Sequence, residues 1–185
     1  MSAVKKVGVL IGSLRKESNS RKIAKAAIAL APGSLSFNII EIGGVSFFNQ
    51  DHEAEPPADW VGLRQEIKAN DAILFVTAEY NRSIPGVLKN AIDVGSPPYG
   101  QSTFNAKPAG VISTSIGAVG GFGANHHLRQ SLAFLNMPTL AQPEMYLGNS
   151  SQLVDEAGEV TNDATRDYLV SFGIVFADWI NKHSA

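Results

Sequence analysis

The sequence contains no cysteine among its 185 residues. Disulfides, thiolate nucleophiles and cysteine ligands for zinc or iron–sulfur clusters are therefore excluded. Charge of either sign is scarce and balanced, with 15 Lys and Arg against 17 Asp and Glu and a formal net charge of −2. A nucleic-acid-binding protein concentrates its cations on one face, and the longest basic runs here have two residues, so we expect no nucleic-acid partner.

Long apolar runs are missing as well. The apolar segment that follows Met1 ends at Gly12, which is too short to span a membrane, and it lacks the cleavage pattern of a signal peptide. We therefore expect a cytoplasmic protein without a membrane partner. Hydrophobic residues still make up 44% of the chain, enough for a sizeable core. Because no linker or internal repeat divides the sequence, we expect one domain over residues 1–185.

Several short apolar stretches have the composition of strands that are buried on both faces. Their residues are mainly β-branched or large and apolar, without the polar alternation of a half-exposed strand, as is typical of parallel sheets. The predicted strands are 4–11, 35–42, 72–78 and 109–115, with a less regular fifth within 137–147.

Helical patterns separate these strands. Apolar residues recur at spacings of three and four, and the predicted helices are 20–31, a segment around 60–67, 84–94, 125–134 and 162–181. For the third helix we expect Ser83 as the N-cap and Pro85 in the first turn. Alternating strands and helices predict right-handed βαβ units. Five of each suit a doubly wound α/β fold with a parallel sheet of order 2-1-3-4-5 and helices on both faces.

A ligand of such a sheet binds beyond the carboxyl ends of the strands, near the point where the strand order reverses. The loop after the first strand offers the hydroxyls of Ser13, Ser18 and Ser20 at the start of a helix, and Arg15 adds a cation. This set suits a phosphate dianion, and its position disfavours the alternative of an ordinary serine N-cap. The loop matches neither GxxxxGK[ST] nor GxGxxG, which favours a terminal phosphomonoester such as that of FMN.

Two further loops meet at the same edge of the predicted sheet. After the third strand, Tyr80 offers an aromatic face between the polar side chains of Glu79 and Asn81, although a tyrosine that only packs is equally compatible with the composition. After the fourth strand, the glycine-rich loop 113–123 allows close backbone approach to a flat ligand and leaves N–H groups free for ring carbonyls. The alternative for this loop is a flexible entry into a helix.

Three stretches resemble the NADPH-dependent FMN reductase family, which includes bacterial quinone, azo and chromate reductases. They are GSLRKESNS at 12–20, AEYNRSIPGVLKNAID at 78–93 and the run 107–130 that ends in HLRQ. Their order and spacing hold across essentially the whole chain. The resemblance implies a flavodoxin-like fold, non-covalent FMN, NADPH or NADH as electron donor, and a homodimer or homotetramer with FMN sites near the subunit interfaces.

The resemblance also implies which residues hold the cofactor. Those expected at the phosphate are Ser13, Arg15, Ser18 and Ser20. Those expected at the isoalloxazine ring are Ala78, Glu79, Tyr80 and Asn81, with Thr114, Ser115 and Gly117 at its other edge. Arg82 follows directly and is a candidate for attracting the NADPH phosphate or an anionic acceptor, with a solvated surface arginine as the alternative.

Three positions depart from the usual family pattern. Ala78 stands where a proline is common, and Val94 stands where a tryptophan is common. His126 replaces a tyrosine of many relatives, so the contact in the tetramer between that tyrosine and a glutamate aligned with Glu144 is not expected to carry over unchanged.

The expected function is an FMN-dependent NAD(P)H oxidoreductase that reduces flavin, quinone or similar small acceptors by ping-pong hydride transfer. Since the flavin carries the chemistry, we predict no catalytic side chain, and no residue cluster suggests a metal site. The alternative is a flavodoxin-type electron carrier without NAD(P)H turnover, which the modest net charge and Arg15 disfavour. A hydrolase is disfavoured because Ser113–Gly117 lacks the first glycine of GxSxG and because adjacent His126 and His127 point to different helix faces.

Overall fold

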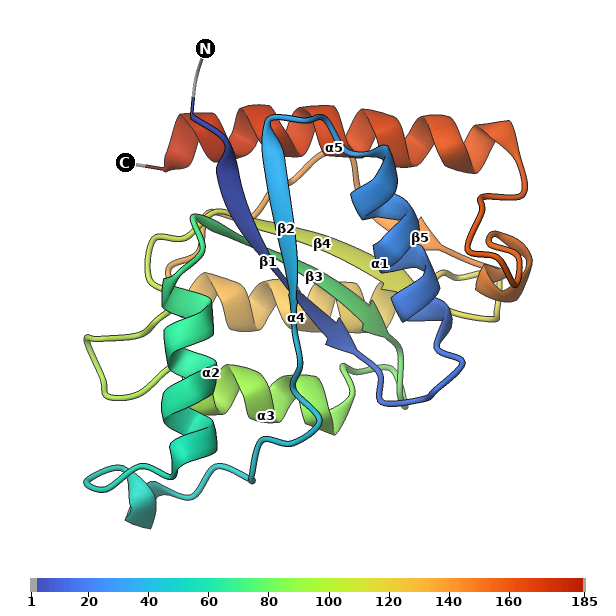
Figure 1. Cartoon of the computed structure of the whole chain (residues 1–185). Coiled ribbons are helices and arrows are strands. Elements are labelled where there is room, and N and C mark those ends of the chain that lie inside the picture. The colour runs from blue at the N-terminus through green and yellow to red at the C-terminus, as the bar shows by residue number, and fades with distance from the viewer. Residues whose placement is uncertain (1–2, 185) are drawn as a thin grey trace.

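A computed structural model describes residues 3–184 as a sheet between two layers of helices (Figure 1). The strands are β1 (Lys5–Gly12), β2 (Leu35–Ile40), β3 (Ala72–Ala78), β4 (Ala109–Thr114) and β5 (Met145–Leu147). The helices are α1 (Asn19–Leu30), α2 (Ala58–Lys68), α3 (Gly86–Gly95), α4 (Phe122–Phe134) and α5 (Asp163–His183). Two short 3-10 helices are η1 (Gln50–His52) and η2 (Ser150–Gln152).

All five strands are parallel and lie in the order β2-β1-β3-β4-β5, which confirms the predicted doubly wound, flavodoxin-like α/β fold. Strand β1 aligns Val7 with Phe37 of β2 on one side and with Ala72 of β3 on the other. The order reverses between β1 and β3, so the crevice expected to hold a ligand lies at the carboxyl ends of these two strands.

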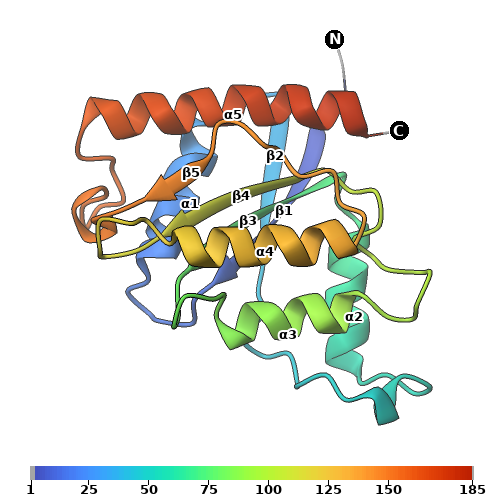
Figure 2. The same cartoon turned by 180° about the vertical axis from the view of Figure 1, so that it is seen from behind.

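Helices cover both faces of the sheet, with α1 and α5 on one side and α2, α3 and α4 on the other (Figures 1 and 2). Successive side chains of β3 alternate between the two cores because a strand has a period of two. Leu74 packs with the α1 and α5 side chains, whereas Phe75 packs with those of α2 and α3. Both residues are buried, as the unbroken apolar run predicted.

Some element boundaries differ from those expected. The fifth strand has three residues, and the preceding segment 137–144 is a loop in which Pro138 and Pro143 have no N–H to donate to a ladder. Helix α4 begins at Phe122, earlier than predicted, because Gly121 adopts a left-handed conformation with φ of 76° as its N-cap. None of the helices within residues 3–184 combines the length and hydropathy of a membrane span.

The predicted N-cap of α3 is wrong. Pro85 occupies that position without a capping side chain, and Ser83 instead closes a turn with Tyr80. Asn81 and Arg82 form the tip of this turn with φ of 50° and 65°. Two positive φ values in succession are the signature of a type I′ turn, whose backbone hydrogen bonds here draw Ser83 away from the helix.

Candidate functional site

A cavity of about 200 Å³ lies at the carboxyl ends of β1, β3 and β4. The three loops that follow these strands line it, together with the first residue of η2. Nine of the twelve expected site residues contribute to its wall, and they are Ser13, Arg15, Ser18, Ser20, Ala78, Glu79, Tyr80, Thr114 and Ser115. Asn81, Arg82 and Gly117 do not line it. The sheet topology thus brings together loops that lie far apart in the sequence.

Serine hydroxyls and a helix terminus form one end of the cavity. Ser18 is the N-cap of α1 and accepts the Arg21 N–H at 3.2 Å, so the first turn of the helix faces this end. Ser13 and Ser20 are both buried beside it. A helix N-terminus carries partial positive charge and free N–H groups, which favour an anion here.

Arg15 adds a full positive charge to this end of the cavity. Its neighbour Arg21 is held by Glu41 at 2.7 Å, a pairing that raises the pKa of Arg21 and lowers that of Glu41. Lys22 lies 3.8 Å from Glu17. Within residues 3–184, Arg15 makes no such ion pair with a carboxylate. Arg15, which lines the cavity, is therefore available to pair with an anionic ligand.

The type I′ turn forms a second wall. Tyr80 and Ser83 exchange two backbone hydrogen bonds of 2.9 Å, and the Tyr80 side chain remains about half exposed. Arg82 points into solvent and pairs with Glu79 at 3.1 Å. The turn thus presents an aromatic face to the cavity, with Asn81 and Arg82 at its outer tip.

Hydrogen bonds hold the glycine-rich loop after β4 at several points. Ser113 Oγ donates to the Gly120 carbonyl at 2.8 Å, and the Gly117 carbonyl accepts the Asn149 N–H at 3.2 Å. A Cβ on Gly120 would lie 2.5 Å from the carbonyl carbon of Tyr146, so a side chain is excluded there. The N–H groups of Ile116, Ala118 and Val119 donate to no backbone carbonyl of residues 3–184, which suits the recognition of polar ring edges.

Three lining residues were not predicted from the sequence: Asn19, Ile116 and Ser150. Asn19 and Ile116 lie inside loops that had been singled out. Ser150 follows the weakest strand, and no motif marks it. Its place depends on its backbone N–H, which donates to the Ser115 carbonyl at 3.0 Å.

An aromatic cluster lies behind the glycine-rich loop. His126 Nε2 and the Tyr146 hydroxyl are hydrogen-bonded at 2.9 Å, and Phe122 contacts both rings. Burial and the nearby Glu144 raise the pKa of Tyr146 to about 12. His126, a departure from the usual family tyrosine, thus has a partner within its own chain.

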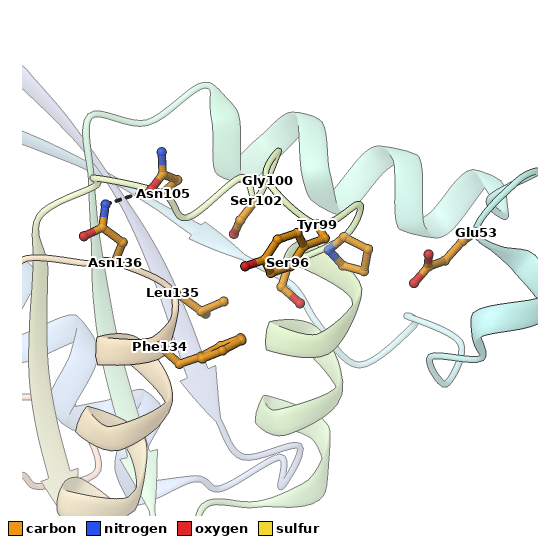
Figure 3. A pocket seen from close by; sticks show the side chains of 10 residues that line it. Glu53, Ser96, Tyr99, Gly100, Ser102, Asn105, Phe134, Leu135 and Asn136 are labelled. Atoms are coloured by element: carbon orange, nitrogen blue, oxygen red, sulfur yellow. Dashed lines mark hydrogen bonds between the residues drawn. The ribbon is translucent and has the colours of Figure 1, made fainter.

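A larger hollow of about 430 Å³ lies at the C-terminal ends of α3 and α4 and shares no lining residue with the first cavity. Figure 3 shows the side chains of Tyr99, Phe134 and Leu135 around it. Glu53 is the one charged side chain among the described residues that line it. Without a cation or a helix N-terminus, this hollow does not suit a phosphate, so the smaller cavity is the candidate site.

The donor set of the smaller cavity fits FMN. Hydroxyl groups, the unpaired Arg15 and the start of α1 match a phosphomonoester, while Tyr80 and the backbone amides of the glycine-rich loop match a flat ring with polar edges. No group of three or more His, Cys, Asp or Glu side chains arranged to hold a metal ion occurs within residues 3–184.

Comparisons with known proteins agree with this geometry. The family model for NADPH-dependent FMN reductases matches residues 5–152. The chain is 55% identical to a quinone reductase of Pseudomonas putida over the full length of both chains. It is 41% identical to a 2-hydroxy-1,4-benzoquinone reductase of a Burkholderia species, covering 95% of this chain and 96% of the relative.

A solved structure shows the same fold. The flavoenzyme FerB, an NAD(P)H:(acceptor) oxidoreductase of Paracoccus denitrificans, superposes with a TM-score of 0.93 at 40% identity and covers 98% of this chain and 100% of its own. A flavodoxin from Pseudomonas aeruginosa superposes with a TM-score of 0.60 at 17% identity, which shows the fold alone. The predicted resemblance is confirmed, and the chain belongs to the NADPH-dependent FMN reductase family.

Proposed function

We propose that this oxidoreductase binds FMN non-covalently in the cavity at the carboxyl edge of the sheet and uses NADPH or NADH to reduce quinones and similar small acceptors. The observation that carries the proposal is the convergence of three distant loops on one cavity that combines an unpaired cation, a helix N-terminus and an aromatic face. Membership of a reductase family supports the activity.

The phosphate would bind at the start of α1. Ser13, Ser18 and Ser20 supply hydroxyl donors, and Arg15 supplies a guanidinium that can form two parallel hydrogen bonds to phosphate oxygens. Ser150 adds a further hydroxyl, whose oxygen accepts from Asn19 Nδ2 at 3.5 Å. These groups bind and orient the cofactor and take no part in bond breaking.

The ring would lie between Tyr80 and the loop that contains Thr114, Ser115 and Gly117. Tyr80 offers a flat apolar face, and the loop offers backbone donors. When bound, FMN would supply the redox chemistry, namely two-electron transfer from the nicotinamide to the acceptor. The surrounding residues would hold and orient the ring, and none of them is assigned as a general acid or base.

We also propose that the protein acts as a homodimer or homotetramer. Tyr99 is 97% exposed and Phe134 is 82% exposed, and both border the hollow at the ends of α3 and α4. Large apolar side chains that gather on a surface favour an interface between subunits. Sedimentation at several protein concentrations tests whether the protein forms a homodimer or a homotetramer.

The electron-carrier alternative makes a different kinetic prediction. A carrier binds FMN but oxidises no NAD(P)H by itself, whereas a reductase consumes NAD(P)H steadily when an acceptor is present. The purified, FMN-loaded protein is mixed with NADPH, or with NADH, and a soluble benzoquinone. Acceptor-dependent oxidation of either nucleotide supports the proposal, and its absence with both nucleotides would favour the carrier.

A further inference from the structure

Glu79 is a nearly buried carboxylate at the junction of two cavity walls. Its side chain is 10% exposed, and each of its oxygens has a donor within the protein. Oε2 accepts the backbone N–H of Ala124 at 3.1 Å, and Oε1 accepts from Arg82 Nη1 at 3.1 Å. Ala124 is the third residue of α4, so its N–H is one of the four at a helix start that have no partner within the helix.

Helix α4 has no side chain at its own N-cap that could accept the Ala124 N–H. Its N-cap residue is Gly121, which has no side chain, and the first turn contains no acidic residue. By contrast, α1 and α5 are capped locally by Ser18 and Asn162. Glu79, which precedes Ala124 by 45 residues, supplies to α4 both the missing hydrogen bond and the negative charge that a helix N-terminus favours.

The same contact fixes the distance between the two walls. Glu79 and Tyr80 belong to the loop after β3, whereas α4 continues directly from the loop after β4. The backbones approach closely at this point, because a Cβ on Gly123 would lie 2.8 Å from the Arg82 carbonyl oxygen and 3.0 Å from Glu79 Oε2. A second tether lies nearby, where Ser83 Oγ and His127 Nδ1 are hydrogen-bonded at 2.6 Å.

We propose that Glu79 is a positioning residue that caps α4 from the opposite wall and thereby sets the width of the slot between Tyr80 and the glycine-rich loop. That the slot holds a flavin ring rests on the proposed function. Each carboxylate oxygen already has a donor within the protein, and in this proposal Glu79 acts on the ligand through the spacing of the walls. The ion pair with Arg82 contributes little to the wall spacing, because the Arg82 side chain is 77% exposed.

Three variants distinguish the effect of the capping hydrogen bond from the effect of the Glu79 charge. Glu79→Gln keeps an amide oxygen that can accept the Ala124 N–H, Glu79→Leu removes the acceptor at similar size, and Arg82→Ala removes only the exposed partner. The first readout is amide hydrogen exchange of residues 122–126 in the flavin-free protein. Glu79→Leu speeds exchange there about tenfold, and the other two variants stay within about threefold of the parent. If Glu79→Leu leaves this exchange unchanged, the capping role is refuted.

The second readout is the FMN dissociation constant, followed by quenching of flavin fluorescence. Glu79→Leu weakens FMN binding about tenfold, and Glu79→Gln restores it to within about threefold of the parent. If Glu79→Gln binds FMN as poorly as Glu79→Leu while its exchange is normal, the carboxylate acts on the ligand directly and the proposal is wrong. Should Glu79→Leu fail to fold, Glu79→Asp, which keeps the charge but cannot reach as far, takes its place with the same expected losses.

The two proposals fail in different ways. If the parent protein binds no FMN, the proposed function is wrong, and the exchange comparison still decides whether Glu79 caps α4. If the parent binds FMN and every Glu79 variant matches it in both readouts, only the positioning role is lost.

Discussion

The hydroxyl groups of Ser20 and Thr114 are hydrogen-bonded at 2.9 Å, and both side chains are buried. This bond joins the first turn of α1 to the end of β4 across 94 residues of sequence. It lies at the wall of the candidate site, where the phosphate end of the cavity meets the loop expected to hold the ring.

Removing one of these hydroxyls takes away the protein partner of the other. We expect Thr114→Val to lower the free energy of unfolding by about 0.5–1.5 kcal/mol, the net contribution of one intramolecular hydrogen bond. The double variant Ser20→Ala with Thr114→Val should cost less than the sum of the two single changes. Urea unfolding of the flavin-free proteins measures all three values, and strict additivity would argue against the bond.

Arg15 should act through the phosphate alone. Arg15→Ala is expected to weaken FMN binding by about tenfold or more, since a charge-assisted contact to phosphate is lost. Riboflavin, which lacks the phosphate, should bind the variant and the parent equally. Arg21→Ala is the matched control, because Arg21 is already paired with Glu41. An equal loss for riboflavin and FMN would show that Arg15 does not contact the phosphate.

Gly123 tests the close approach of the two walls. A Cβ at this position would lie 2.8 Å from the Arg82 carbonyl oxygen, so Gly123→Ala should push the turn away from α4 and cost about 1–3 kcal/mol of stability as well as FMN affinity. Gly62 in α2 has no atom within 4 Å of its Cβ position, and Gly62→Ala should be neutral or stabilising by up to about 1 kcal/mol. Thermal unfolding and FMN titration of both variants make the comparison, and equal effects would contradict it.

The pKa of Tyr146, raised to about 12, gives a pH dependence with a definite sign. A phenol whose pKa is higher in the folded than in the unfolded chain stabilises the fold fully below the unfolded value, near 10, and this stabilisation is lost as the pH rises toward 12. Tyr146→Phe should therefore flatten the fall in melting temperature between about pH 10 and 12. If the melting temperatures of the parent and the variant fall equally steeply over this pH range, Tyr146 is not responsible for the fall.

The sequence was sufficient for the fold because the sheet is buried on both faces. An unbroken run such as AILFVTA at 72–78 predicts a central strand, and the alternation with helices leaves few topologies. The topology in turn predicts where the loops meet, which is why nine of the expected residues line one cavity. That these residues bind FMN remains a prediction.

Long-range backbone contacts could not be predicted. Ser150 reaches the cavity through a backbone bond to Ser115, and Glu79 caps a helix that begins more than 40 residues later. Neither contact leaves a local pattern in the sequence. The predicted N-cap role of Ser83 was wrong for a related reason. Its spacing before Pro85 favours an N-cap, but the left-handed turn at Asn81 and Arg82 engages the Ser83 backbone instead.

The most direct test of the central proposal is the absorbance spectrum of the purified protein after FMN is added and the excess removed, followed by NADPH under anaerobic conditions. Flavin bands near ~450 nm that are retained by the protein and bleach with NADPH, or with NADH, are the expected result. Retained flavin that neither nucleotide bleaches would assign the protein to the electron carriers. A protein that retains no flavin would contradict the proposed function.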